Sequence, residues 1–296
     1  MSETIAVKTA AKKDSYYRDV LKKFTAHKLA MLGVAIILLE VFLVVFLPIF
    51  MKLDPYSSDI MAFGAAPSAA HWLGTDDTGR DVFARLIYGG RVSLLVGLLS
   101  AIISLCIGVP LGLLAGYYKG IWETIVMRAA DIFMSFPSMI LILVLVALIG
   151  PSVWTVTIVI GVLGWTDFAK LIYGNVLSVR EKEYVEAAKA VGTKDLPLLL
   201  KYVVPNAFAP ILINFTFRTA QAIIQESALS FLGMGVQPPQ ASWGNILYAA
   251  QSITVLSSKP WLWVPPGILL ILTVSSINFI GDGIRDALDS KVKIKK

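Results

Sequence analysis

Four polar side chains interrupt an apolar segment over residues 205–232. They are Arg218, Gln221, Gln225 and Glu226. Because an unpaired arginine near the centre of a bilayer costs roughly 2.5 to 3.5 kcal/mol or more, these side chains are expected to face a helix-bundle interior or a water-filled path. Arg218 and Glu226 lie about two helical turns apart, which predicts a shared face. We predict a substrate pathway at these four positions, in which Arg218 meets either a substrate carboxylate or a structural partner on another subunit.

Catalytic and metal-binding patterns are weak elsewhere. The chain has no G-x-x-x-x-G-K-[ST] phosphate loop, so it is not expected to hydrolyse ATP by that route. His27 and His71 stand apart, without a cysteine or carboxylate spacing that indicates zinc. Residues 76–81, DDTGRD, lack the ligand spacing and distal glutamate of a calcium loop, which favours a capped turn before a helix at 80–88. We expect no catalytic residue, metal site or cofactor in this chain.

A second charged pair, Arg128 and Asp131, lies near the start of another apolar run. Residues three apart on a helix are neighbours, so the two charges can neutralise each other. We favour this structural salt link over a proton relay, which is the functional alternative for ionisable residues inside a membrane. Pro137 follows in the same run and predicts a kink.

The composition places the chain among membrane proteins. Of its 296 residues 56% are hydrophobic and 16% are charged, and the mean hydropathy is +0.73. The net charge of +6 comes from basic residues at the two ends and in one central loop. Such positions flank membrane spans, which argues against a nucleic-acid partner and for contact with lipid.

Six apolar segments are long enough to cross a bilayer as helices. They cover residues 29–50, about 92–115, a run from the turn at 118–120 to about 149, 153–174, 205–232 and 265–280. The predicted fold class is an all-α integral membrane protein with six transmembrane helices.

The charge distribution predicts the topology. Residues 1–28 carry seven Lys or Arg and lack a signal-peptide pattern, so we expect a retained cytoplasmic tail with an interfacial helix near 15–27. An acidic-leaning segment at 51–90 is expected outside. Residues 91–284 would form a five-helix core, and 285–296 a second cytoplasmic tail that contains Lys291, Lys293, Lys295 and Lys296. Both termini are therefore predicted to be cytoplasmic.

A polar island at 178–205 separates the fourth and fifth spans. Residues 184–191 favour a helix, Gly192 permits the left-handed conformation that ends one, and a second helix is expected from Asp195 to a new break at Pro205. Paired alanines beside a glutamate offer a small-residue face for another protein. The predicted docking residues are Tyr184, Glu186, Ala187, Ala188, Gly192 and Pro205.

This island resembles the EAA loop, or coupling helix, of ATP-binding-cassette importer permeases. Glu186-Ala187-Ala188, Gly192 and Pro205 fall at the family spacing, while Tyr202 and Val204 depart from the usual Ile and Leu. Three other stretches resemble the C-type permeases of dipeptide, oligopeptide and nickel transporters: HWLGTDDTGRDVFARLIYGGRVSLLVG at 71–97, ESALSFLGMGVQPPQASWGNIL at 226–247 and INFIGDGIRDALD at 277–289.

The resemblance implies a heteromeric importer in a prokaryotic cytoplasmic membrane. Its other parts would be a second, homologous permease, two cytoplasmic ATPases that bind ATP and Mg, and an extracytoplasmic solute-binding protein. The resemblance also implies transport by alternating access. It favours di- or oligopeptides as the substrate, with nickel or metal chelates as the alternative. A secondary transporter or channel, or an intramembrane enzyme, is a less favoured class.

Overall fold

Helices make up most of the protein. We analysed a computed structural model that describes residues 18–289, and within that range it contains two isolated β-bridges but no strand. Residues 18–26 are helical. The helices that follow are α2 (Lys28–Met51), α3 (Val82–Tyr118), α4 (Gly120–Ser135), α5 (Ser138–Ile149), α6 (Val153–Leu163), α7 (Trp165–Arg180), α8 (Glu183–Ala190), α9 (Asp195–Leu198), the π-helical η1 (Leu199–Val203), α10 (Val204–Phe231), α11 (Trp243–Leu247), η2 (Tyr248–Gln251), α12 (Ile253–Ser258), η3 (Pro260–Leu262) and α13 (Val264–Leu288).

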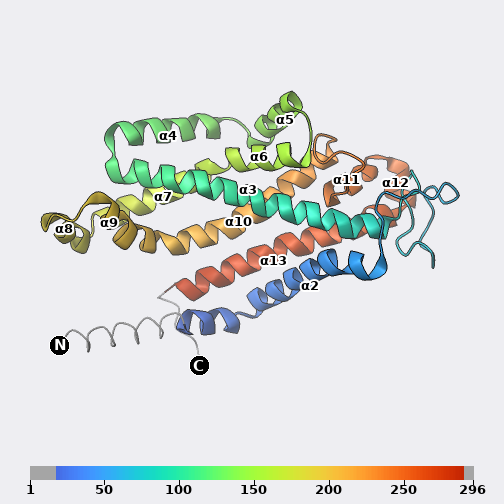
Figure 1. The fold of residues 1–296 in the computed structure, drawn as a ribbon, viewed down its shortest axis with the longest axis horizontal. Coiled ribbons are helices and arrows are strands. Elements are labelled where there is room, and N and C mark those ends of the chain that lie inside the picture. The colour runs from blue at the N-terminus through green and yellow to red at the C-terminus, as the bar shows by residue number, and fades with distance from the viewer. Residues whose placement is uncertain (1–17, 290–296) are drawn as a thin grey trace.

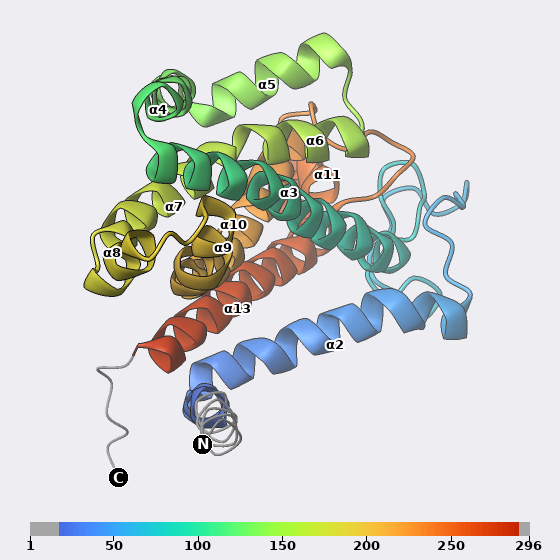
Figure 2. The same ribbon diagram turned by 60° about the vertical axis from the view of Figure 1, so that its left-hand side comes forward.

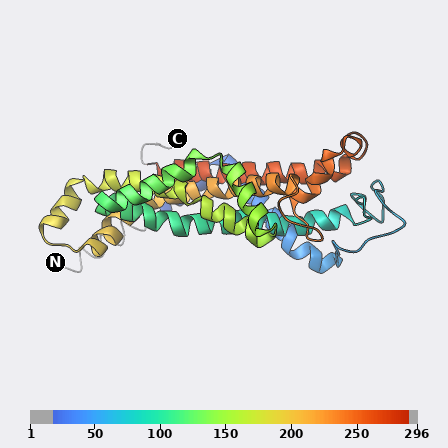
Figure 3. The same ribbon diagram turned by 90° about the horizontal axis from the view of Figure 1, so that it is seen from above.

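The long helices α2, α3, α10 and α13 run side by side along the longest axis (Figures 1 and 3). α10 packs between α3 and α13, α2 packs on α13, and α4 and α5 lie on the opposite side of the bundle from α2 (Figure 2). α8 and α9 lie at the same end as the start of α2 and the end of α13, whereas residues 52–81, α11 and α12 lie at the other end (Figure 1). The tail lysines at 8, 12, 13, 291, 293, 295 and 296 lie outside the described residues.

Five helical segments of the described chain are long and apolar enough to cross a membrane, and the pair α4–α5 makes up to six. The protein is thus a helical membrane protein, as predicted. The pair bends by 89° at Phe136–Pro137. Pro137 therefore separates two helices instead of only kinking one, because proline cannot donate the hydrogen bond that would continue the first helix.

Three other boundaries differ from the predicted ones. The helix expected at 80–88 and the second span form one helix, α3, so the expected boundary at residue 90 falls inside it. The fourth span consists of two helices, α6 and α7, which meet at Gly164, and it continues to Arg180. The break expected at Pro205 is absent, because the π-helical η1 leads directly into α10, of which Pro205 is the second residue.

Small residues let α3 and α7 approach closely. Gly108, Gly112 and Gly116 lie at four-residue spacing on the α3 face that meets α7. A Cβ at Gly112 would come within 2.6 Å of the Ala169 carbonyl oxygen, and one at Gly116 within 2.7 Å of Val176 Cβ. This stripe allows the two helix backbones to pack closely in lipid.

The predicted capped turn precedes α3. The Asp81 carboxylate accepts a hydrogen bond from the Ala84 N–H at 2.7 Å and contacts His71 Nδ1 at 2.8 Å. The hydrogen bond with Asp81 raises the pKa of His71, with a further contribution from Asp59. Burial alone would raise the pKa of Asp76, but hydrogen bonds from Thr78 and Arg80 hold it below its usual value. These contacts fold residues 52–81 against the start of α3.

The expected pairing of Arg128 with Asp131 is wrong. Asp131 instead lies 2.8 Å from the Lys170 ammonium on α7. The helix α4 packs against α7, so a residue distant in sequence provides the partner. The salt link is still structural, and it ties the two helices together.

Candidate functional site

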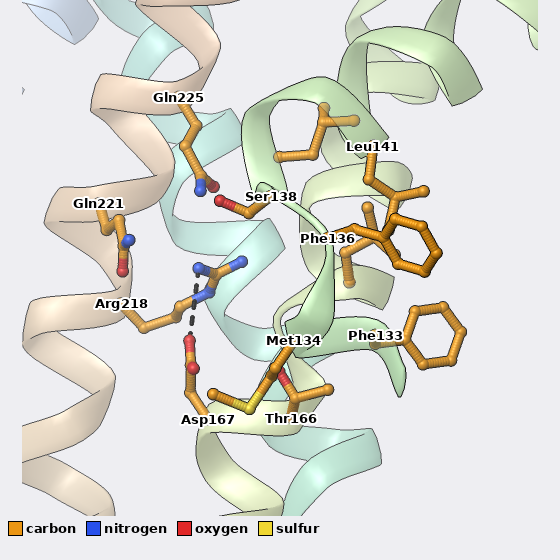
Figure 4. A pocket seen from close by; sticks show the side chains of 12 residues that line it. Phe133, Met134, Phe136, Ser138, Leu141, Thr166, Asp167, Arg218, Gln221 and Gln225 are labelled. Carbon is orange, nitrogen blue, oxygen red and sulfur yellow. Dashed lines mark ion pairs between the residues drawn. The ribbon is translucent and has the colours of Figure 1, made fainter. Parts of the chain in front are cut away.

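A cavity of about 300 Å³ lies between the bent pair α4–α5, the joint between α6 and α7, and α10 (Figure 4). Three of the four predicted pathway residues line it, namely Arg218, Gln221 and Gln225. The facing wall is mostly apolar, with two hydroxyls and one carboxylate: Phe133, Met134, Phe136, Ser138, Leu141, Ile142, Leu163, Thr166 and Asp167.

Arg218 is held at the joint of the fourth span. Its Nη2 donates a hydrogen bond to the Ile160 carbonyl at 2.8 Å, near the end of α6, and Nη1 lies 3.7 Å from Asp167 Oδ2 in the first turn of α7. A Cβ at Gly164 would overlap the guanidinium, so the glycine leaves the room that Arg218 fills. Arg218 therefore connects α10 to both halves of the jointed span.

Two polar atoms at the cavity wall are buried without a hydrogen-bond partner in the described part of the chain. One is the donor Arg218 Nε and the other is the acceptor Gln225 Oε1. Figure 4 shows the Arg218 guanidinium above Asp167 and the Gln225 side chain on the same side of α10. Because a buried polar group without a partner is costly, such atoms indicate a place where a ligand or water completes the hydrogen bonding.

Glu226 does not line the cavity, and the expectation that it shares a face with Arg218 is wrong. Glu226 follows Arg218 by eight residues, which amounts to two full helical turns plus about 80°, so the two side chains point in different directions. The side chains of Gln221 and Gln225 point closer to the direction of Arg218. Glu226 is 0% exposed. It accepts hydrogen bonds from Ser230 at 2.7 Å and from Ser93 of α3 at 3.0 Å.

The Glu226 cluster anchors the loop between α10 and α11. Ser230 also accepts a hydrogen bond from the Val236 N–H at 3.0 Å, and Ser93 accepts one from the Trp243 N–H at 3.2 Å. The carboxylate thus orients two hydroxyls that hold the loop. No cation pairs with Glu226 among residues 18–289, so its hydrogen bonds are its compensation for burial.

Replacing Glu226 by leucine is expected to loosen this loop. The substitution removes the acceptor of three buried hydroxyls, those of Ser93, Ser227 and Ser230, and each unsatisfied group costs about 1 to 3 kcal/mol. We expect the apparent Tm of the purified protein to fall by roughly 5 °C or more. Glu226→Gln keeps one acceptor oxygen and should lose less than half as much. Equal losses in differential scanning fluorimetry would contradict this role of the carboxylate.

The predicted docking element forms a helical hairpin at one end of the molecule. The hairpin consists of α8, the turn at Gly192, α9 and η1. Gly192 ends α8 with a φ of 80°. The Thr193 N–H bonds to the Ala188 carbonyl and the Gly192 N–H to the Lys189 carbonyl, which is the Schellman arrangement. A helix end at Gly192 and a second helix at Asp195 agree with the sequence analysis.

One side of this hairpin is anchored and the other is open. Val185, Ala188 and Leu198 pack with the ends of α3 and α7, and the Tyr117 hydroxyl donates to Asp195 at 2.6 Å. The two alanines therefore have different environments, because Ala188 is buried while Ala187 is exposed. Among the exposed residues are Tyr184, Glu186, Ala187, Gly192, Pro205 and the apolar Val191, Leu196 and Leu200, with Val191 82% exposed.

The hairpin and the cavity are connected by one continuous helical segment. The candidate span Asp195–Phe231 contains α9, η1 and α10, and it carries both Leu196 of the hairpin and Arg218 at the cavity. Leu196 and Arg218 are therefore joined by helix, without an intervening loop.

Sequence analysis did not identify two residues that hold Arg218 in place, Asp167 and Gly164. Asp167 lines the cavity, and an acid inside a span is a functional candidate by default. Gly164 carried no signal of its own, because its importance depends on Arg218, 54 positions later in the chain.

Comparison with known proteins gives consistent matches over nearly the whole chain. Residues 108–294 match the family described as "Binding-protein-dependent transport system inner membrane component", and residues 15–67 match the "N-terminal TM domain of oligopeptide transport permease C". A protein of Brucella suis biovar 1 (strain 1330) named as a peptide permease is 41% identical, over 92% of this chain and 90% of its own length. The oligopeptide transport system permease protein OppC of Bacillus subtilis (strain 168) is 38% identical, over 97% and 94%.

The arrangement of helices is also similar to that of a solved structure. A chain of the MetNI methionine ABC transporter, in an inward-facing conformation, superimposes with a TM-score of 0.58 over 70% of this chain and 98% of that one. Its sequence identity is 20%, so the likeness concerns the fold.

Proposed function

Because the chain belongs to the family of binding-protein-dependent transport system inner membrane components, we propose that it is the permease subunit of an ATP-binding-cassette importer for peptides. The observation that carries this conclusion is the match to peptide permeases over more than nine-tenths of the chain. The chain is a multi-pass protein of the inner membrane and a permease, not an enzyme. Its family implies ATPase and substrate-binding partners.

We further propose that the exposed side of the hairpin docks on an ATPase. Support comes from the exposed apolar residues Val191, Leu196 and Leu200, which are flanked by charged side chains. Tyr184, Glu186, Ala187 and Gly192 contribute to the same element, and Ala188 anchors it from within. Pro205 begins the helix that carries the motion inward.

The full assembly that we propose contains a second, homologous permease, two ATPases and an extracytoplasmic binding protein. Both termini of this chain would be cytoplasmic. Support comes from the position of the hairpin at the same end of the bundle as the start of α2 and the end of α13. Residues 52–81 at the opposite end would then face the binding protein.

The mechanism that we propose for this arrangement is alternating access. ATP binding draws the ATPases together, α8 moves with the ATPase that holds it, and α10 passes the displacement to Arg218 and the joint at Gly164. Arg218, Gln221 and Gln225 line the proposed substrate pathway, and Glu226 stabilises the loop above it.

Uptake by the complete transporter tests the proposal. In proteoliposomes with the partner permease, ATPases and binding protein, labelled peptide should enter only with ATP and should be insensitive to collapse of the proton gradient. Uptake that survives ATP depletion but not loss of the gradient would favour a secondary transporter. Uptake of nickel chelates in place of peptides would favour the metal-chelate alternative.

A further inference from the structure

We propose that the cavity beside α10 binds the carboxyl-terminal end of the transported peptide, with Arg218 and Gln225 as its ligands and Asp167 as a displaceable counter-ion. The inference rests on the peptide import proposed above and adds which part of the peptide this chain recognises. It is carried by the two unpartnered polar atoms and by the geometry of the ion pair.

A ligand with complementary chemistry would satisfy the two unpartnered atoms. Arg218 Nε needs an acceptor and Gln225 Oε1 needs a donor, and both belong to buried residues that line the same cavity. The last residue of a peptide carries an acceptor and a donor close together, namely its carboxylate and its amide N–H. A guanidinium binds a carboxylate with charge-assisted hydrogen bonds, which are stronger than neutral ones.

Asp167 is well placed to give way to such a carboxylate. The Arg218 side chain is 5% exposed, whereas that of Asp167 is 41% exposed, and their closest approach of 3.7 Å is longer than a hydrogen bond. Exchange of one carboxylate for another never leaves the buried guanidinium without a counter-ion, which would be strongly unfavourable. Once it is displaced, the partly exposed Asp167 side chain can rotate toward the solvent, where water hydrates its carboxylate.

The volume of the cavity limits the size of the ligand that it can bind. A volume of about 300 Å³ is at the lower end of the range of pockets for small ligands, so it fits the terminal part of a peptide and not a long chain. The apolar wall around Met134, Phe136 and Leu141 can receive the last side chain without a strict preference for its shape.

A purely structural role for Arg218 is the competing explanation. Its hydrogen bond to the Ile160 carbonyl and its fit against Gly164 support the joint of the fourth span whether or not a peptide is present. The two roles differ in one respect, because only the carboxylate site distinguishes a peptide acid from the corresponding amide.

The test compares labelled tri-alanine with its carboxyl-terminal amide in proteoliposomes of the complete transporter. Uptake of each is divided by the occupancy of the binding protein, measured separately by calorimetry, so that selection by that protein cancels. We expect the wild type to favour the acid by about tenfold, which corresponds to about 1.4 kcal/mol. Arg218→Gln should bring this ratio close to one while uptake of the amide persists, and Arg218→Lys should keep part of the preference.

Asp167→Asn provides a second variant that keeps the buried arginine. Removal of the competing carboxylate should lower the half-saturating concentration of the acid about threefold to tenfold and leave that of the amide unchanged. Asp131→Asn is the matched control, since this exposed acid pairs with Lys170 and does not line the cavity; it should change neither value.

Each outcome decides the proposal. An acid-to-amide ratio that Arg218→Gln leaves unchanged, or an equal loss of both peptides in Asp167→Asn, would overturn it in favour of the structural role. Failure of the wild type to take up either peptide would instead contradict the proposed import function. The two failures are therefore distinguishable.

Discussion

Replacing Gly192 by valine is expected to reduce ATP-driven peptide uptake at least tenfold while the chain still inserts into the membrane. Gly192 has a φ of 80°, and an added Cβ would meet no atom within 4 Å in the described structure. The effect therefore comes from the backbone and not from a clash. The left-handed conformation costs an L-residue about 1 to 2 kcal/mol and is least tolerated by β-branched side chains.

Gly192→Asn is the matched control, because asparagine adopts the left-handed conformation far more readily than valine. It should retain most of the uptake. The same samples should be tested for co-purification of the ATPases and for ATP hydrolysis, since loss of the hairpin geometry predicts release or uncoupling of the ATPases. Full uptake in the valine variant would contradict the assignment of this hairpin as the coupling element.

Replacing Gly108 by alanine is expected to weaken the packing of α3 on α7. The added methyl group would lie 2.5 Å from Phe168 Cβ and would overlap the Trp165 carbonyl oxygen. The α7 backbone has little room to move away, because Gly112 and Gly116 hold it close one and two turns further along. Overpacking of this kind costs about 1 to 3 kcal/mol.

Gly174→Ala is the matched control, because it makes the same chemical change at a helical glycine whose Cβ meets nothing within 4 Å. Both substitutions gain about 1 kcal/mol of helix propensity, so only contact with the neighbouring helix separates them. We expect the Gly108 variant to show a lower apparent Tm and less folded complex in size-exclusion chromatography, and the Gly174 variant to resemble the wild type. Equal stabilities would mean that α3 and α7 separate more easily than their contacts indicate.

Features that depend on neighbouring residues were predictable. Gly192 ends its helix because of its own backbone freedom, and Asp81 caps α3 through an N–H only three residues away. The apolar runs that form the spans are likewise local, since their length and composition suit a bilayer. Gln221 and Gln225 follow Arg218 at helical spacing, and all three line the cavity.

Features that depend on distant residues were not predictable in the same way. Glu226 has a helical direction that differs from that of Arg218, and Ser93 of α3 provides one of its hydrogen bonds. Asp131 pairs with Lys170 because α4 packs on α7, although Arg128 is its nearer neighbour in sequence. Periodicity describes one helix and cannot state which helix packs against it.

The sequence by itself therefore determined that the chain is a helical membrane protein with a polar hairpin between its fourth and fifth spans, because hydropathy and backbone preferences act within a few residues. Only the tertiary structure decided that Arg218 meets Asp167 and the end of α6, that Gly164 makes room for it, and that Glu226 supports a loop outside the cavity. The physical reason is that burial and ion pairing join residues that the chain holds far apart, and their partners are set by helix packing.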